Sequence, residues 1–224
     1  DIHILKDNEV VVFHDKNLKR MTGIDKNIKD VTYNDIKDLK LLDTDNYIPR
    51  LMDVLKLVGG RVPLIIELKK DTKDYRLERE VIKILDNYKY EYAKQCFATG
   101  KYQRAMLLLA DLVHFEKGTD NGQECLYMLA MSQYCTKNYE DAAQAFKKYY
   151  QSYPKGVYAE IAQFYIGQSL YDGTPEPRLD QSQTLAAISA FQEYLDLFPD
   201  AELKSTAQQR LFDLQDKLVK KELL

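Results

Sequence analysis

The chain has 224 residues, which suffices for one large domain or two small ones. Its net charge of -3 provides no basic field that would favour nucleic acid as a partner. No apolar run approaches the roughly 18 residues that cross a bilayer, so we expect no transmembrane segment. The three cysteines lack metal-ligand spacing and are interpreted as buried free thiols: Cys96, Cys125 and Cys135.

The amino-acid composition changes sharply along the chain. Residues 1–88 contain no Ala, Gln, Ser or Cys, whereas residues 89–224 contain 15 Ala and 14 Gln. Ile and Val show the reverse trend, with 18 in the first 88 residues and 6 in the next 136. Because β-branched residues favour strands and Ala favours helices, the change indicates an α/β segment followed by an all-α segment. The missing Gln and Ser favour a further interpretation, two segments of different ancestry in one fused or chimeric chain.

Short apolar runs alternate with helical patterns in residues 1–88. Strands are expected at 1–5, 9–13 and 62–68, and helices at 32–42, 48–60 and 77–88. The helix at 32–42 has Thr32 or Asn34 as a candidate N-cap. The continuous apolar run VPLIIEL at 62–68 is typical of a buried parallel strand. The alternation of strand and helix therefore predicts βαβ units with a parallel sheet.

Polar residues directly follow two of the expected strands. His14-Asp15 comes after the strand at 9–13, and Glu67 lies at the end of the strand at 62–68. Loops at the carboxyl ends of parallel strands converge, so these side chains are candidates for one site. Taken singly, Glu67 could be a solvated charge at a strand end and His14 could cap a turn. His3 is interpreted as a strand residue without a role.

The stretches DIHILKDNEVVVFHDKNLKRMTG and IPRLMDVLKLVGGRVPLIIELK together resemble the glycerophosphodiester phosphodiesterase family, whose fold is a (β/α)8 barrel. Asp1 matches the Asp of the family's Glu-x-Asp motif, His14-Asp15 matches its His-Asp, and Glu67 and Lys69 match its Glu-Leu-Lys. The resemblance implies Asp1 and Glu67 as metal ligands, and His14, Asp15 and Lys69 as catalytic residues. Carboxylates suit Ca2+ or Mg2+, and a histidine suits the proton transfer of phosphodiester cleavage.

The family pattern also places a His-Arg pair and a Glu upstream of Asp1, and the sequence does not include them. A (β/α)8 barrel needs about 250 residues, so residues 1–88 are expected to form only a partial barrel. We therefore expect no phosphodiesterase activity from the sequence as given. The resemblance implies Ca2+ or Mg2+ only if the site is complete, and no cofactor otherwise.

Residues 89–224 contain a repeat in which a small residue precedes a large one by four positions. Members of the first series, spaced by 37 residues, are Ala93 with Phe97, Ala130 with Tyr134, and Gly167 with Tyr171. A second series comprises Ala105 with Leu109, Ala142 with Phe146, and Ala187 with Phe191. Small residues facing large ones let helices approach closely, and helix pairs repeated at this period form an α-solenoid. We expect about three helix pairs and a final helix.

These units, such as KNYEDAAQAFKKYYQSYP, resemble tetratricopeptide repeats (TPRs), although the usual Trp is missing. Residues 89–224 are more closely similar to the BamD family, lipoproteins of the outer-membrane β-barrel assembly machinery. The resemblance implies a scaffold on the periplasmic side of the outer membrane. Its implied partners are β-barrel assembly components or unfolded outer-membrane protein segments. Which residues contact a partner cannot be derived from the sequence, and neither can a location for residues 1–88.

Two functional hypotheses remain open: an interaction scaffold carrying an inactive phosphodiesterase-like segment, or a metal-dependent phosphodiesterase that acts on glycerophosphodiesters. A third possibility is that pieces of two proteins are joined. Because residues 77–99 contain neither Pro nor Gly, we predict one continuous helix from about Leu77 to about Thr99, with the junction near Tyr88. Gly100 is the expected stop, since glycine readily adopts a positive φ. Such a helix would hold the segments rigidly.

Overall fold

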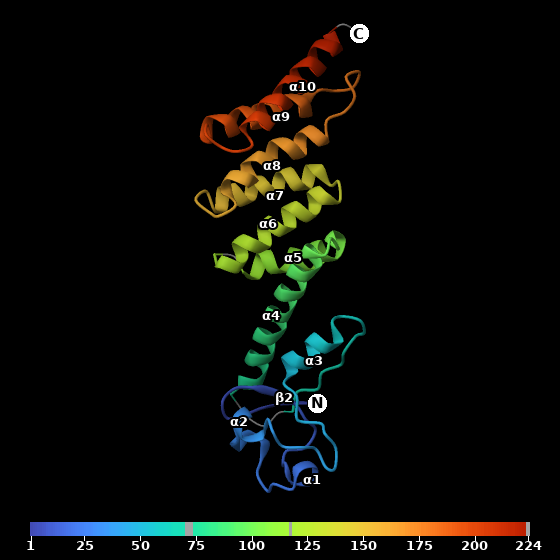
Figure 1. Cartoon of the computed structure of the whole chain (residues 1–224), viewed down its shortest axis with the longest axis vertical. Coiled ribbons are helices and arrows are strands. Elements are labelled where there is room, and N and C mark those ends of the chain that lie inside the picture. The colour runs from blue at the N-terminus through green and yellow to red at the C-terminus, as the bar shows by residue number, and fades with distance from the viewer. Residues whose placement is uncertain (70–73, 117, 223–224) are drawn as a thin grey trace. The chain divides into compact units, whose positions relative to one another are not determined.

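The computed structural model describes residues 1–69, 74–116 and 118–222 (Figure 1). Contacts along the chain separate two compact units, Asp1–Tyr92 and Ala93–Leu224. The first is called the hairpin unit and the second the repeat unit. From composition, the boundary was expected between residues 88 and 89.

The hairpin unit is built around two short antiparallel strands, β1 (Ile2–Ile4) and β2 (Val10–Val12). Ile2 lies opposite Val12 in the ladder, which confirms the two strands predicted at 1–5 and 9–13. The helical elements of this unit that precede residue 76 are α1 (Lys19–Thr22), the 3-10 turn η1 (Ile28–Asp30), α2 (Tyr33–Ile36) and α3 (Leu51–Val58).

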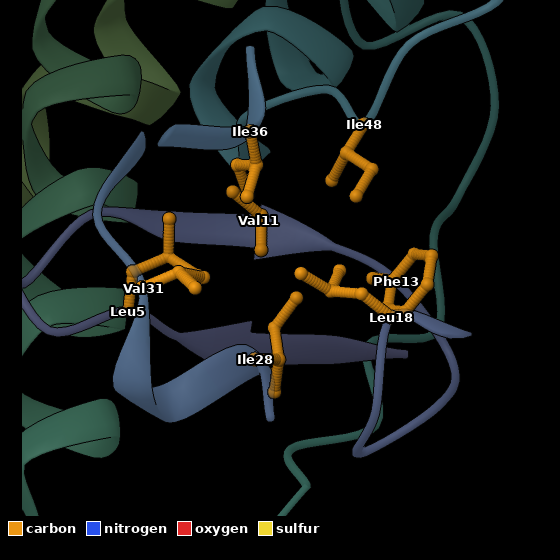
Figure 2. Close-up of a cluster of buried hydrophobic side chains, with 8 residues drawn as sticks. All are labelled: Leu5, Val11, Phe13, Leu18, Ile28, Val31, Ile36 and Ile48. Carbon is orange, nitrogen blue, oxygen red and sulfur yellow. The ribbon is translucent and has the colours of Figure 1, made fainter. Parts of the chain in front are cut away.

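Successive strand side chains point to opposite faces of the hairpin, and each face packs in a buried hydrophobic cluster. Val11 lies in the cluster shown in Figure 2, which comprises Leu5, Val11, Phe13, Leu18, Ile28, Val31, Ile36 and Ile48. Its neighbour Val10 lies in a second cluster with Ile2, Ile4, Leu51, Leu55, Leu77 and Val81. The hairpin therefore contributes side chains to two small hydrophobic cores, one on each face, and this packing holds it in place.

The parallel sheet predicted for residues 1–88 does not form within the described residues. Residues 62–68 make one parallel bridge, between Leu68 and Ile2, and otherwise have no strand structure. Ile65 is 100% exposed, so the prediction of a buried strand at 62–68 is wrong. An apolar run becomes a buried strand only where neighbours pair with its backbone, and here only its last residues reach β1. A partial (β/α)8 barrel is therefore not shown by the described residues.

The helix predicted at 32–42 is also too long, because α2 ends at Ile36. Its start is as predicted: the backbone N–H and hydroxyl of Thr32 both donate to the Asp35 carboxylate, at 2.8 and 2.7 Å. These bonds hold the pKa of Asp35 below its usual value. Downstream, the Leu42 N–H donates to the carbonyl of Met21 at 2.7 Å instead of continuing a helix. This tertiary hydrogen bond replaces the i to i-4 pattern that spacing alone suggested.

Helix α4 (Arg76–Ala98) is a single 23-residue helix, within one residue of the predicted limits at both ends. Leu77 and Val81 of its first half pack in the second cluster of the hairpin unit. Ala93 and Cys96 of its second half are buried in the repeat unit. Gly100 follows with a φ of 73°, the left-handed conformation expected of a helix stop.

The repeat unit continues with helices joined by short connections, and consecutive helices from α5 to α10 pack against each other (Figure 1). They are α5 (Tyr102–Phe115), α6 (Asp120–Cys135), α7 (Tyr139–Ser152), α8 (Ala159–Asp172), α9 (Ser182–Leu197) and α10 (Lys204–Glu222). Such packing between sequence neighbours is typical of a TPR-like solenoid.

The small residues of the repeat are sites of close helix approach, as predicted. Gly167 on α8 lies against Phe191 on α9, and a Cβ at position 167 would be 2.8 Å from the Phe191 ring. Ala142 and Ala187 are fully buried with the large residues of their series, Phe146 and Phe191. The spacing of small and large residues therefore encodes the distance between neighbouring helices.

Candidate functional site

The five predicted site residues lie together at one end of the hairpin. Asp1 precedes β1 and His14-Asp15 follows β2, and antiparallel pairing brings these two ends side by side. The bridge between Ile2 and Leu68 adds Glu67 and Lys69 to the same place. Backbone hydrogen bonds fix this junction: the Ile2 N–H donates to the Glu67 carbonyl at 3.0 Å, and the Lys69 N–H donates to the Ile2 carbonyl at 3.1 Å.

Acidic and basic side chains alternate through this cluster. Lys69 Nζ lies 2.7 Å from Glu67 Oε1 and 3.2 Å from Asp1 Oδ1. The other oxygen of Asp1, Oδ2, lies 3.8 Å from His14 Nε2, and His14 Nδ1 lies 2.9 Å from Asp15 Oδ1. His14 is thus held between two carboxylates, an arrangement that suits a side chain that transfers protons.

Two further residues contact this cluster: Arg20, which was not singled out from the sequence, and His3, which lies in β1 as expected. Arg20, on α1, pairs with Asp15 in a bidentate manner, with Nε 2.6 Å from Oδ2 and Nη2 3.0 Å from Oδ1. His3, interpreted as having no role, is fully buried, and its Nε2 lies 3.2 Å from the backbone carbonyl of His14. Basic residues are frequent in this segment, so no sequence signal singled out Arg20.

Asp15 is the most strongly perturbed acid of the cluster. The hydrogen bond from Arg20, and second that from His14, lower its pKa from 3.8 to about 2. Lys69 likewise lowers the pKa of Glu67. Because the pKa of Asp15 is lower in the folded state, its pairing stabilises the fold above pH 4 and loses that effect as the pH falls through about 2.

Replacing Arg20 by Gln should raise the pKa of Asp15 from about 2 towards 3.8, because the largest cause of its depression is removed. The measurement is an NMR titration of the side-chain carboxyl carbons in both proteins. Lys19→Gln is the matched control, since Lys19 is a neighbouring cation that pairs with Asp25 at 2.8 Å. An Asp15 pKa that stays near 2 in Arg20→Gln would contradict the assignment.

An open depression of about 670 Å³ lies beside this cluster. Its lining is His14, Asp15, Lys16, Asn17, Lys19, Arg20 and Lys69. Four of these seven side chains are Lys or Arg, and three of them, Lys19, Arg20 and Lys69, are each paired with a carboxylate. An anionic group such as a phosphate is the ligand that this lining favours.

A second concave surface lies in the repeat unit. Helices α7 and α9 both pack on α8, and a furrow of about 390 Å³ lies over α8 between them. Its lining residues are Ala143, Gln144, Lys147, Tyr150, Gln151, Gln163, Ile166, Leu170, Ala186, Ser189, Ala190 and Glu193. The side-chain oxygen of Gln163 is buried and without a hydrogen-bond partner among the described residues.

Two family models match the chain, one over its N-terminal part and one over its C-terminal part. Residues 84–224 match the family model described as YfiO, outer membrane lipoprotein, which covers more than half of the chain. The chain belongs to the YfiO family. Residues 1–111 match a second family model, the glycerophosphoryl diester phosphodiesterase family. Two families therefore meet in one chain, and both models include residues 84–111, where α4 ends and α5 begins.

The chain is also similar to individual curated proteins whose names indicate phosphodiesterase activity. Lysophospholipase D GDPD1 of Homo sapiens is 31% identical over 137 residues, covering 49% of this chain and 43% of the relative. The putative glycerophosphodiester phosphodiesterase YhdW of Bacillus subtilis (strain 168) is 30% identical over 99 residues, covering 40% of each. The chain thus spans less than half the length of these curated relatives.

The phosphodiesterase resemblance implies a divalent metal with Asp1 and Glu67 as its ligands. The two proposed ligands, Asp1 and Glu67, both contact the Lys69 ammonium group, so a cation already lies between them. Across residues 1–69, 74–116 and 118–222, no three His, Cys, Asp or Glu side chains gather in a way that could hold a metal ion. The described residues do not fit a divalent metal.

The description of the matching family names an outer membrane lipoprotein. None of the helices in the described part of the chain combines the length and the apolar character that crossing a bilayer requires.

Proposed function

We propose that this YfiO-family chain is a protein-binding scaffold of TPR type, and that it takes an extended polypeptide segment in the furrow over α8. The observation that carries the proposal is the furrow itself, a depression of about 390 Å³ lined by three consecutive helices. By family, its partners are components or substrates of outer-membrane protein assembly, and its place is at the outer membrane, on the periplasmic side.

The lining of the furrow suits an extended chain. Ala143, Ala186 and Ala190 form low walls that allow a backbone to approach closely. Ile166 and Leu170 give the floor apolar surface for side chains of the bound segment. The unpaired oxygen of Gln163 is a buried acceptor, whose lack of a partner costs about 1–3 kcal/mol. An N–H group of a bound segment would pair with this oxygen only after the Gln163 side chain turned towards the furrow, because the oxygen is buried.

Replacing Ala186 by Arg should weaken polypeptide binding by at least ~10-fold, because the long side chain fills the furrow from one wall. Ala186 is exposed, so the change is compatible with folding. The measurement is fluorescence anisotropy of a labelled, unfolded segment of an outer-membrane β-barrel protein, titrated with the full chain.

Ala110→Arg is the matched control, since Ala110 is an exposed alanine on α5, outside the furrow. It should bind the labelled segment as the unaltered chain does. Equal affinities for Ala186→Arg and Ala110→Arg would remove the furrow as the binding site. No binding by the unaltered chain would remove the scaffold proposal for this class of partner.

A second candidate function is hydrolysis of glycerophosphodiesters, and the cluster around His14 favours it. His14 lies between Asp15 and Asp1, at the edge of a depression lined by Lys and Arg. The lining would hold the phosphate, and His14 would transfer the proton that cleavage of the phosphate ester requires. The relatives named lysophospholipase D and glycerophosphodiester phosphodiesterase support this substrate class.

A further inference from the structure

We propose that the ammonium group of Lys69 occupies the place of a divalent cation between Asp1 and Glu67, so that this site excludes Ca2+ and Mg2+. The inference rests on the second candidate function, because it concerns how the phosphodiesterase-like site is charged. It departs from the metal site that family resemblance implies for these two carboxylates.

The contacts of Lys69 are those of a bound cation. One nitrogen lies within 3.2 Å of oxygens from two carboxylates that are 66 positions apart in the sequence. The Lys69 side chain is 22% exposed, so most of it is enclosed by the junction. Its backbone is fixed as well, because the Lys69 N–H donates to the carbonyl of Ile2. The backbone pairing fixes the start of the Lys69 side chain, and its ammonium group lies between Asp1, which is 23% exposed, and Glu67, which is 64% exposed.

The remaining donors do not offer a metal an alternative position. Ca2+ takes six to eight oxygen ligands and Mg2+ demands a near-octahedral set. The third carboxylate of the cluster, Asp15, uses both oxygens to accept hydrogen bonds from Arg20. A metal ion would therefore have to displace Lys69 from two ion pairs, or Arg20 from a bidentate pair.

The net charge of the cluster also disfavours binding of a divalent ion. Glu67, Asp1 and Asp15 supply three negative charges, and Lys69 and Arg20 supply two positive charges. These five side chains together leave a single negative charge, which gives little attraction for a divalent ion. Lys69 also lines the depression, so the same ammonium group can face a phosphate oxygen. Because its charge is shared between two carboxylates, Lys69 would supply only part of the positive charge that a divalent metal would bring to the anion.

The test is calorimetric titration of the full chain with CaCl2 and with MgCl2. The unaltered chain should bind neither ion more tightly than about 1 mM, the weak end of protein calcium sites. Lys69→Met should bind Ca2+ at least ~10-fold more tightly than the unaltered chain, because two carboxylates lose their ammonium partner. Lys69→Arg should behave like the unaltered chain, since it retains a cation.

Lys19→Met is the matched control, because Lys19 lines the same depression but pairs with Asp25. It should leave calcium binding unchanged. The inference is overturned if the unaltered chain binds Ca2+ below about 1 mM and Glu67→Gln removes that binding. This result comes from the unaltered chain and from Glu67→Gln, so it does not depend on whether Lys69→Met folds.

Failure of the second candidate function would look different. A chain that binds no Ca2+ and hydrolyses no glycerophosphocholine supports the cation replacement by Lys69 and rejects the hydrolase candidate. A chain that binds Ca2+ through Glu67 and hydrolyses the diester rejects the replacement and supports the candidate. The calcium titration and the hydrolysis assay therefore decide the two proposals separately.

Discussion

If the full chain hydrolyses glycerophosphodiesters, His14→Ala is expected to lower the rate by ~10²–10⁴-fold, the typical contribution of a general acid or base. Asp15 accepts a hydrogen bond from His14 Nδ1 at 2.9 Å and orients the ring. The opposite nitrogen, Nε2, lies 3.8 Å from Asp1 at the edge of the Lys- and Arg-lined depression. Alanine removes the only histidine among the seven residues that line it.

The measurement is release of choline from glycerophosphocholine, with and without added Ca2+ or Mg2+. His114→Ala is the control, because His114 is an exposed histidine on α5, in the repeat unit, and should leave the rate unchanged. A rate that His14→Ala leaves intact would assign the turnover to some other site. If the unaltered chain shows no turnover, the phosphodiesterase candidate fails and the expectation of an inactive segment holds.

Phe191→Ala is expected to destabilise the repeat unit by about 3–5 kcal/mol, the usual cost of truncating a buried Phe. Phe191 is fully buried, and its ring lies 5.8 Å from that of Phe164. It also fills the space beside Gly167, where no side chain is available to close the resulting cavity. The cavity would therefore lie between α8 and α9, the pair that forms the floor and one wall of the furrow.

This destabilisation can be measured by urea denaturation of the full chain, followed by helical circular dichroism. Phe212→Ala is the matched control, since Phe212 lies on α10 with 66% of its surface exposed, and it should change stability by less than about 0.5 kcal/mol. Equal unfolding midpoints for the two variants would show that contacts of Phe191 do not hold the repeat together. A second effect expected of Phe191→Ala is weaker polypeptide binding, because the furrow loses a fixed wall.

The fold of the repeat unit was easier to predict than that of the hairpin unit, because helices depend on residues close together in the sequence. A helix is held by hydrogen bonds within its own sequence, so the spacing of Ala142 and Phe146 reports both the helix and its contact face. The limits of α4 followed from an apolar stripe and from Gly100 in the same way. The prediction of a strand at 62–68 was wrong because strand formation depends on a partner elsewhere in the chain, which an apolar run does not specify.

The candidate site was predictable as a set of residues but not as an arrangement. Family resemblance named Asp1, His14, Asp15, Glu67 and Lys69, and the structure brings all five together, while their roles remain predictions. The position of Lys69 between two acids could not be derived, because it depends on the bridge between Ile2 and Leu68. Arg20 was missed for the same reason, since its partner is decided by how α1 turns back towards Asp15.

Helix α4 has a consequence for how the chain opens in solution. The division between the units falls between Tyr92 and Ala93, inside an uninterrupted helix. Breaking a helix in its middle exposes backbone groups on both sides of the break, whereas fraying at an end exposes few. Amide hydrogens around residues 88–96 should therefore exchange with solvent more slowly than those near Arg76. The point where two families meet would then be one of the slower-exchanging stretches of the backbone.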